Sequence, residues 1–478
     1  MTPVRSYPVD FGHSYEGRAY HAPVGGEWKR SFCCQRKGLI APTLRKDVVE
    51  ARTWLESTKK RGMALGLKGT RTVLDRLELS LPEHILHVAG SNGKGTVCAL
   101  MATGLGLEGI GNVLFSSPHV VRLEERVRRN GIPISSEEFD QAILLIHDAA
   151  CGEGHETIVD LTFFEVTYLV AMIASQGSSV LILETGLGGR LDATRCGPAT
   201  ACMVTSVTRE HIDILGDDLP AIAREKAAIA RPKRPLFIRE PIETEVLEAM
   251  KLEARNAGNS ELGETPSPAE VYVVEIEKGS TVRNEAYLLA LAMFQHLGFS
   301  TESLETARDN LRWLARMQFL PSSSTSSHPY LLDAAHNPSG LLRILPELEQ
   351  QITKHATHVT GMPIWSLIFG TSPQEELSHF LAPLLDFCRK YPPKNIVLTK
   401  PHGGRYPGVS PESLSLLDWN RDDVQCYELP SDAIHSLASY DAKHVGLVVS
   451  LGSLYLQGNL LSIFGWSSDE HLSLYAKD

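Results

Sequence analysis

The stretch Val88-Ala89-Gly90-Ser91-Asn92-Gly93-Lys94-Gly95-Thr96 decides the fold class of this chain. The apolar run at 84–90 leads into it and predicts a buried strand, and residues 94–107 predict a helix. A glycine-rich turn between a strand and a helix lets backbone N–H groups point at a polyphosphate, and the helix N-terminus adds positive partial charge. The sequence therefore predicts a phosphate-binding loop at the end of a buried strand.

This loop departs from the usual G-x-x-x-x-G-K-[ST] spacing. Gly90 lies three residues before Gly93, and Gly95 is inserted between Lys94 and Thr96. We expect Lys94 to meet the β- and γ-phosphates of ATP and the Thr96 hydroxyl to reach Mg²⁺. A tight turn without a ligand is the alternative, and the lysine and threonine in this context argue against it.

Outward from the loop, apolar runs alternate with amphipathic stretches. Strands are predicted at 84–90, 112–116, 179–184, 201–206, 330–333, 365–369, 395–399 and 445–450. Helices are predicted at 94–107, 161–176, 219–230, 338–351 and 373–389. Strands separated by helices are typical of parallel sheets covered on both faces. The expected fold class is α/β, with a P-loop-containing parallel-sheet ATPase domain followed by a smaller Rossmann-like α/β domain.

The expected domain boundaries follow from changes in this pattern. Residues 1–45 lack hydrophobic periodicity and are expected to be a disordered extension. Residues 46–312 would form the ATP-binding domain and residues 329–478 the C-terminal domain. Between them, residues 313–328 contain a Ser-rich run that is typical of a hinge or linker.

Composition restricts the partners and the location. The formal net charge of −11 argues against nucleic acid as the main partner, because phosphate neutralisation needs a positive field. No uninterrupted apolar run reaches the roughly 18 residues of a membrane span, so we expect a soluble protein without a membrane partner. We also expect a monomer. The eight cysteines are scattered, which favours reduced thiols and a cytoplasmic location. The basic, acid-poor N-terminal segment leaves a mitochondrial location as the alternative.

Polar residues follow three further predicted strands, at the edge where open α/β sheets bind ligands. Ser117 follows the second strand, Glu184 ends the third, and His211 follows the fourth. Mg²⁺ accepts one carboxylate together with hydroxyls and waters, so Glu184 is its natural anchor. Each residue also has a purely structural alternative. Ser117 could be a turn hydroxyl bonded to nearby backbone, and Glu184 could cap a helix or form an ion pair. His211 could be a hydrogen-bonded loop histidine.

Two more candidates lie farther along the chain. Lys226 lies in a predicted alanine-rich helix. A lysine side chain usually lies on the solvated face of a helix, and the alternative is that Lys226 packs closely inside a site. Asp333 and His336 share one short turn after a predicted strand. Asn337 before Pro338 is also a helix-start signal, and both interpretations of this turn can hold together.

As a set, these segments resemble the folylpolyglutamate synthase and dihydrofolate synthase branch of the Mur ligase family, from roughly residue 60 to the C-terminus. The motifs that carry the resemblance are Leu65-Gly66-Leu67, HVAGSNGKGT (87–96), SSPHVVRLEERV (116–127), ETGLGGRLDAT (184–194), SVTREHIDILG (206–216), AREKAAIARP (223–232), RWLARMQ (312–318), LLDAAHNP (331–338) and SLGSLYLQGNLL (450–461). The resemblance implies a two-domain fold of the Mur ligase type.

The resemblance implies roles at the matching positions. Nucleotide contacts are implied at Gly90, Asn92, Gly93, Lys94, Gly95, Thr96, Asn284, Arg316, Asp333 and His336. Metal contacts are implied at Thr96, Ser117, Glu184, His211 and Lys226, with Lys226 carried as a carbamate. Catalytic roles are implied at Lys94, Lys226 and His336. Arg126 is implied for the incoming L-glutamate and Asp192 for the pterin substrate.

The implied activity is ATP- and Mg²⁺-dependent addition of L-glutamate to dihydropteroate, to folates, or to both, through an acyl phosphate. Several positions depart from the family pattern: Leu314-Ala315 replaces Pro-Gly, Ala334 replaces glycine, Arg195 replaces asparagine, and Glu210 stands where an aspartate usually adjoins the histidine. Two alternatives therefore stay open. One is a ligase of the same mechanism acting on a non-folate acid, and the other is a non-catalytic nucleotide-binding homologue.

Overall fold

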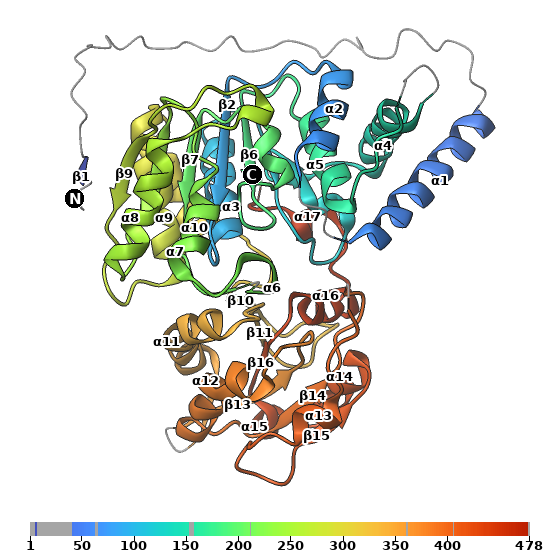
Figure 1. Ribbon diagram of the computed structural model, residues 1–478. Coiled ribbons are helices and arrows are strands. Elements are labelled where there is room, and N and C mark those ends of the chain that lie inside the picture. The colour runs from blue at the N-terminus through green and yellow to red at the C-terminus, as the bar shows by residue number, and fades with distance from the viewer. Residues whose placement is uncertain are drawn as a thin grey trace.

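The computed structural model describes residues 5–6, 41–62, 66–152, 157–210, 212–359, 362–404 and 406–476. Two sheets dominate it, and each has helices on both faces (Figure 1). No helix in these described ranges is long and apolar enough to cross a membrane.

The first sheet has nine strands in the order β1-β9-β8-β7-β2-β6-β3-β4-β5. The strands are β1 (Arg5–Ser6), β2 (His84–Ala89), β3 (Asn112–Phe115), β4 (Val127–Arg129), β5 (Ile132–Pro133), β6 (Val180–Glu184), β7 (Ala201–Val204), β8 (Pro235–Arg239) and β9 (Glu270–Val274). The strands from β9 to β3 pair in parallel, and the pairs at the two edges are antiparallel. Buried on both faces, the central strands read as continuous apolar runs, as parallel sheets require.

Helices cover both faces of the first sheet. One face carries α1 (Ala41–Thr58), α2 (Lys68–Leu77), α4 (Ser136–Cys151), α5 (Phe163–Ala174), α7 (Leu219–Ala227) and α8 (Thr244–Arg255). The other face carries α3 (Lys94–Leu107), α9 (Val282–Leu297) and α10 (Thr301–Asn310). The short helix α6 (Ile212–Leu215) precedes α7, and 3-10 turns lie at Lys59–Arg61, Leu123–Arg126, Ala193–Cys196 and Ser260–Leu262.

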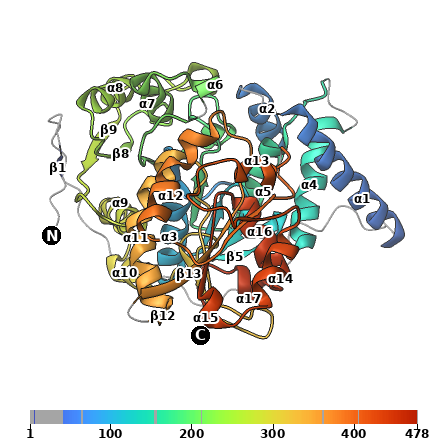
Figure 2. The ribbon, with the colours of Figure 1, turned by 90° about the horizontal axis from the view of Figure 1, so that it is seen from below.

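The second sheet has the order β10-β11-β16-β13-β14-β15, with β12 paired to β13. Its strands are β10 (Gln318–Leu320), β11 (Tyr330–Leu332), β12 (Thr357–Val359), β13 (Met362–Phe369), β14 (Ile396–Thr399), β15 (Gln425–Tyr427) and β16 (Leu447–Leu451). Its helices are α11 (Pro338–His355), α12 (Leu377–Lys390), α13 (Pro411–Ser415), α14 (Pro430–Ala438), α15 (Ala442–Val445) and α16 (Leu454–Ile463). Figure 2 shows α11 and α12 on one side of this sheet and α14 and α16 on the other.

Strand order creates the crevice in which the predicted site lies. The chain runs from β2 through α3 to β3, but β6 is inserted between these two strands in the sheet. Register pairs Val88 of β2 with Glu184 of β6, and Leu183 with Phe115 of β3. The phosphate loop, Glu184 and the segment after Phe115 therefore leave the sheet side by side at its carboxyl edge, where open α/β sheets bind ligands.

Three boundaries differ from the expected domain division. Helix α1 begins at Ala41, inside the segment expected to be an extension, and β1 adds residues 5–6 to the first sheet. The hinge is shorter than expected and runs from Leu311 to Met317, because β10 already pairs with β11 of the second sheet. The Ser-rich run at 321–327 connects these two strands within the second domain, so it is not the linker.

The third difference is at the C-terminus, where the chain returns to the first domain. Helix α17 (Asp469–Leu472) contacts β5, and Figure 1 shows it among the elements of the first domain. Beyond it, the backbone of Leu474 bonds Gly131 and Arg312, and the Tyr475 hydroxyl donates to the Asn130 carbonyl at 3.1 Å. The two domains are therefore joined both at the hinge and through this C-terminal segment.

Replacing Tyr475 with alanine is expected to lower the free energy of unfolding by about 3 kcal/mol, because a large buried ring is removed. The ring lies directly over Gly106 and Gly131, where any side chain would collide with it. Urea unfolding measures the loss, with Tyr440→Ala as the control, since the side chain of Tyr440 is 48% exposed. Equal unfolding midpoints for the two variants would contradict this account of the C-terminal segment.

Candidate functional site

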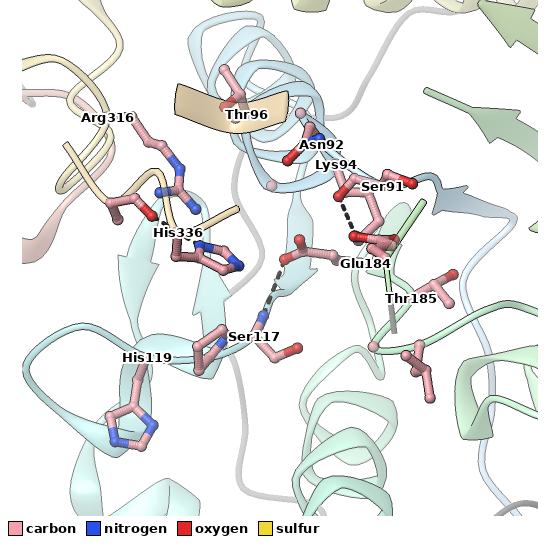
Figure 3. Close-up of a pocket in the computed structure, with 18 of the residues that line it drawn as sticks. Ser91, Asn92, Lys94, Thr96, Ser117, His119, Glu184, Thr185, Arg316 and His336 are labelled. Atoms are coloured by element: carbon pink, nitrogen blue, oxygen red, sulfur yellow. Dashed lines mark hydrogen bonds between the residues drawn. The ribbon is translucent and has the colours of Figure 1, made fainter. Parts of the chain in front are cut away.

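A single large cavity, with a volume of about 1020 Å³, lies between the two domains at the carboxyl edge of the first sheet. The first domain lines it with the phosphate loop and the ends of β3 and β6, and the second domain with the turn that follows β11. Figure 3 shows Glu184 pointing into the space between Lys94, Ser117 and His336. The predicted site residues on its wall are Asn92, Gly93, Lys94, Gly95, Thr96, Ser117, Arg126, Glu184, Asp192, Arg316, Asp333 and His336.

The phosphate loop is held in shape by local contacts. The Lys94 ammonium donates to the carbonyls of Gly90 at 2.7 Å and Ser91 at 3.2 Å. Gly90 has a φ of 141° and lies against Thr205, which leaves no room for a side chain. It is not among the residues that line the cavity, so the structure shows a packing role for Gly90, and its phosphate contact stays a prediction.

The inserted Gly95 has a steric explanation. A Cβ at this position would lie 3.3 Å from a Glu184 carboxylate oxygen and 3.1 Å from the ring of Trp313. Close approach of Glu184 to the start of α3 thus favours glycine between Lys94 and Thr96. The unusual spacing of the loop is therefore coupled to the carboxylate at the end of β6.

Glu184, Ser117 and Thr96 provide a set of hard oxygen ligands. Glu184 is 7% exposed and accepts a hydrogen bond from the Ser117 backbone N–H at 3.0 Å. Burial raises the pKa of its carboxyl group, and the Lys94 charge opposes that rise. Among the residues whose side chains are described, no three His, Cys, Asp or Glu side chains gather around one point. One carboxylate with hydroxyls and waters is a set that Mg²⁺ accepts, so these residues fit that ion.

Lys226 lies behind this wall and not on it. Its side chain is 1% exposed, and its ammonium is 2.7 Å from a carboxylate oxygen of Glu210, which does line the cavity. Burial lowers the pKa of Lys226, and Glu210 opposes that change. The structure therefore favours the packed alternative for this lysine over the solvated one. The predicted ligand His211 lies outside the described residues.

Arg126 is a buried cation that faces the cavity beside an aromatic ring. Its Nε donates to Nδ1 of His119 at 3.0 Å, and its guanidinium lies 5.1 Å from the centre of the Phe163 ring. Burial, with the neighbouring Arg126, lowers the pKa of His119 to about 3, so this histidine is neutral at physiological pH. No carboxylate forms an ion pair with Arg126 in the described part of the chain, so its charge is available to an anionic substrate. Nothing in the sequence indicates that His119 and Phe163 contact Arg126, because these residues are brought together only by the fold.

Asp192 has a structural role that the sequence did not reveal. Its carboxylate accepts backbone hydrogen bonds from Gly186 at 3.0 Å and Leu187 at 2.9 Å, and it caps the turn at Thr194. These bonds shape the glycine-rich loop after β6. The expected pterin contact at Asp192 therefore has to coexist with this loop-organising function.

The second domain contributes a turn that is tightly organised. Asp333 accepts hydrogen bonds from the backbone of Met317 at 2.9 Å and Ala335 at 2.8 Å. Nδ1 of His336 donates to the Ala334 carbonyl at 2.9 Å, which leaves Nε2 as the hydrogen-bond acceptor. Burial lowers the pKa of His336, so the ring is neutral. Arg316, in the hinge, is a cation on this side of the cavity (Figure 3).

Asn284 is not brought to the cavity. Its amide donates to the Ser280 hydroxyl at 3.3 Å, while Thr281, Val282 and Arg283 line the wall instead. The backbone N–H of Asn284 donates to the Thr281 hydroxyl, and this N-cap bond sets the start of α9. The nucleotide contact expected at Asn284 is thus not seen in this conformation.

A set of hydrogen bonds connects the phosphate loop directly to the second domain. The Asn92 amide donates to the Ser339 hydroxyl at 3.0 Å and accepts from the Asn337 amide at 3.2 Å. Ser339 also lies 3.3 Å from the Thr208 hydroxyl, on the segment that leads to Glu210. Sequence reasoning missed Ser339, because nothing local marks a serine that meets a loop 247 positions away.

Arg195, a departure from the family pattern, does not face the cavity. It is 1% exposed, and its guanidinium binds Glu264 at 3.0 Å and the Ala228 carbonyl at 3.0 Å. The departure therefore affects the scaffold and gives no support to a non-folate substrate.

Replacing Arg195 with leucine is expected to lower the free energy of unfolding by about 3 kcal/mol, because breaking a buried pair leaves its partner uncompensated. Arg389→Leu, which breaks a surface pair with Asp386 and Asp418, should cost less than about 1 kcal/mol. Denaturant unfolding compares the two variants. A changed affinity for the acid substrate in the Arg195 variant, with unchanged stability, would contradict this assignment.

The comparisons with known proteins agree with this geometry. No protein-family model matches the sequence. The Escherichia coli dihydrofolate synthase/folylpolyglutamate synthase is 38% identical over 192 residues, 40% of this chain and 44% of that protein. The Bacillus subtilis enzyme of the same name is 28% identical over 63% of this chain and 76% of its own length. The chain is thus similar in sequence to enzymes named dihydrofolate synthase/folylpolyglutamate synthase.

Solved structures extend the likeness to both domains. A structure of Escherichia coli FolC with DHPP and ADP superimposes with a TM-score of 0.69 at 23% identity, over 87% of this chain and 97% of that one. A folylpolyglutamate synthase/dihydrofolate synthase with Mn, AMPPNP and L-glutamate gives 0.68 at 24%, over 87% and 98%. These likenesses confirm the predicted two-domain Mur ligase fold. In sequence, the matched segments span less than half of the Haemophilus influenzae and Escherichia coli relatives, 42% and 44%.

Proposed function

We propose that this chain is an ATP-dependent ligase that adds L-glutamate to dihydropteroate, to a folate, or to both, through an acyl phosphate. One observation carries the proposal: one cavity joins the phosphate loop and Glu184 of the first domain to Arg316 of the hinge and His336 of the second domain. A reaction between a phosphorylated acid and an amine needs both partners aligned in a site closed to water, and an interdomain cavity provides one.

Each wall of the cavity has a proposed task. Thr96, Ser117 and Glu184 would hold Mg²⁺, which neutralises phosphate charge during transfer. Lys94 orients the terminal phosphates, and Arg126 binds a carboxylate group of the incoming amino acid. His336, as a neutral ring with Nε2 free to accept, orients groups that approach from the second domain.

ATP consumption by the purified chain tests the proposal. We expect turnover only when L-glutamate is supplied together with dihydropteroate or a reduced folate, and we expect the chain to complement a strain that lacks folate synthase. Turnover with another acid and none with any pterin would replace the folate assignment by the same mechanism on a different substrate. Tight ATP binding without hydrolysis in every mixture would identify a non-catalytic homologue.

We further propose that Lys226 carries a carbamate, formed when its neutral amine attacks CO₂ and releases a proton. Burial of Lys226, which lowers the pKa of the amine, supports this proposal, and the new carboxylate would lie beside Glu210 near the metal ligands. Carbon-13 NMR of protein equilibrated with labelled bicarbonate should show a carbamate resonance that Lys226→Arg lacks. Identical spectra for the two proteins would leave Lys226 as the ion-pair partner of Glu210.

A further inference from the structure

One arm of the cavity is lined by residues to which nothing above gives a role. Along α11, Gly340, Ile344, Glu347 and Gln351 recur at helical spacing on its wall. Across from them lies the start of α9, with Arg283. Because α11 starts two residues after His336, this arm continues from the phosphate end of the cavity.

Glu347 differs from the other acids of the cavity in having no partner. Glu184 accepts a bond from Ser117, Asp192 from its own loop, and Asp333 from Met317 and Ala335. Within the described ranges, the carboxylate of Glu347 makes neither a hydrogen bond nor an ion pair. It is half-buried, and this burial, with the charge of Asp333 close by, raises its pKa. Burying a carboxylate away from water without a hydrogen-bond donor costs free energy of folding, and a bound ligand that provides the donor removes that cost.

Arg283, the cation across the arm, does not donate a hydrogen bond to Glu347. Two nitrogens of Arg283 donate to the carbonyls of Arg308 at 3.4 Å and Leu311 at 3.3 Å. No ion pair joins Arg283 to Glu347 among the described residues, so the space between them belongs to the cavity. A molecule that fills this space meets a carboxylate acceptor on one side and a guanidinium on the other.

The position along α11 indicates which part of a ligand lies there. Glu347 is nine residues beyond Pro338, which places it about 14 Å along the helix from its start. If phosphates lie at the loop and at His336, this distance extends beyond them to the nucleoside. Acidic side chains commonly bind ribose hydroxyls in dinucleotide sites.

We propose that Glu347 recognises the nucleoside of the bound nucleotide by accepting a hydrogen bond from one of its neutral donors, a ribose hydroxyl or the exocyclic amine of adenine. The inference rests on the proposed function only in placing a nucleotide's phosphates at the loop. Glu347 lies outside every motif that carries the family resemblance, so its role is argued from its position on the cavity wall alone.

Calorimetric binding of four nucleoside diphosphates tests the proposal: ADP, 2′-deoxy-ADP, 3′-deoxy-ADP and inosine diphosphate. The wild-type chain should bind the analogue that lacks the recognised donor about 10-fold more weakly than ADP. In Glu347→Ala that difference should vanish, and in Glu347→Gln it should shrink, because an amide oxygen still accepts. The exposed Gln350→Ala on the same helix should keep the wild-type pattern.

Two results would overturn the proposal. One is a wild-type chain that binds all four nucleotides equally, and the other is an analogue penalty that persists unchanged in a folded Glu347→Ala variant. Neither result would affect the ligase assignment if ligation still proceeds. Conversely, loss of discrimination in Glu347→Ala would support the inference even if no acid is ever ligated.

Discussion

Replacing Lys94 with alanine is expected to lower kcat/KM for ATP-dependent amide formation by at least about 10³-fold. The ammonium sits at the mouth of the phosphate loop, held by the carbonyls of Gly90 and Ser91. No other lysine side chain is placed on the loop, so its charge at the terminal phosphates has no substitute nearby. Steady-state kinetics with saturating acid and L-glutamate measure the loss.

The thermal midpoint of this variant should stay close to that of the wild type, because the lost bonds go to carbonyls beside the cavity. Lys278→Ala, at an exposed turn, should leave kinetics unchanged and serves as the matched control. A Lys94→Ala enzyme with more than a tenth of wild-type activity would exclude a direct phosphate role for this lysine.

Glu184→Gln should show opposite effects on activity and on stability. We expect kcat to fall about 10²- to 10³-fold, together with loss of the dependence on Mg²⁺, because the carboxylate that anchors the ion is neutralised. Without metal, the same variant should have a higher free energy of unfolding than the wild type. The buried carboxylate has a folded-state pKa above its unfolded value, so its contribution to stability is complete at low pH and is lost as pH rises through the folded pKa.

At neutral pH the charge of Glu184 therefore opposes folding, and the amide removes that cost while still accepting the Ser117 bond. Thermal unfolding in a chelator at neutral pH compares the two proteins, with Glu302→Gln on the exposed start of α10 as control. A metal-free Glu184→Gln protein that is less stable than the wild type would show that the carboxylate has a structural partner.

The hinge illustrates a departure whose meaning depended on the structure. Ala315 stands where the family usually has glycine, and it adopts a φ of 55°, in the left-handed region that glycine enters without strain. Its carbonyl nonetheless accepts the backbone bond of Ala334, which ties the hinge to the turn that carries His336. Alanine in place of glycine at position 315 therefore adds backbone strain at the hinge, while the hydrogen bond between the hinge and the turn that carries His336 is kept.

The sequence does not predict the contacts of residues that belong to no local pattern. Glu347 looks like any acid on an amphipathic helix until α11 is seen to form the cavity wall. Lys226 and Glu210 are 16 residues apart, and only packing shows that they pair. The returning C-terminal segment was likewise assigned to the second domain, because its contacts with Gly131 and Arg312 are long-range.

By itself, the sequence determined the strand, the glycine-rich turn and the helix from 84 to 107, because hydrophobic periodicity and glycine dihedral freedom act within a few residues. It also determined the α/β class and the resemblance to folylpolyglutamate synthases and dihydrofolate synthases. Only the tertiary structure decided which side chains meet. Glu184 reaches the phosphate loop because the register sets it opposite Val88, 96 positions earlier. Asn92 meets Ser339 only because the two domains pack together. Register and domain packing are decided by the burial of whole surfaces, and no local pattern encodes them.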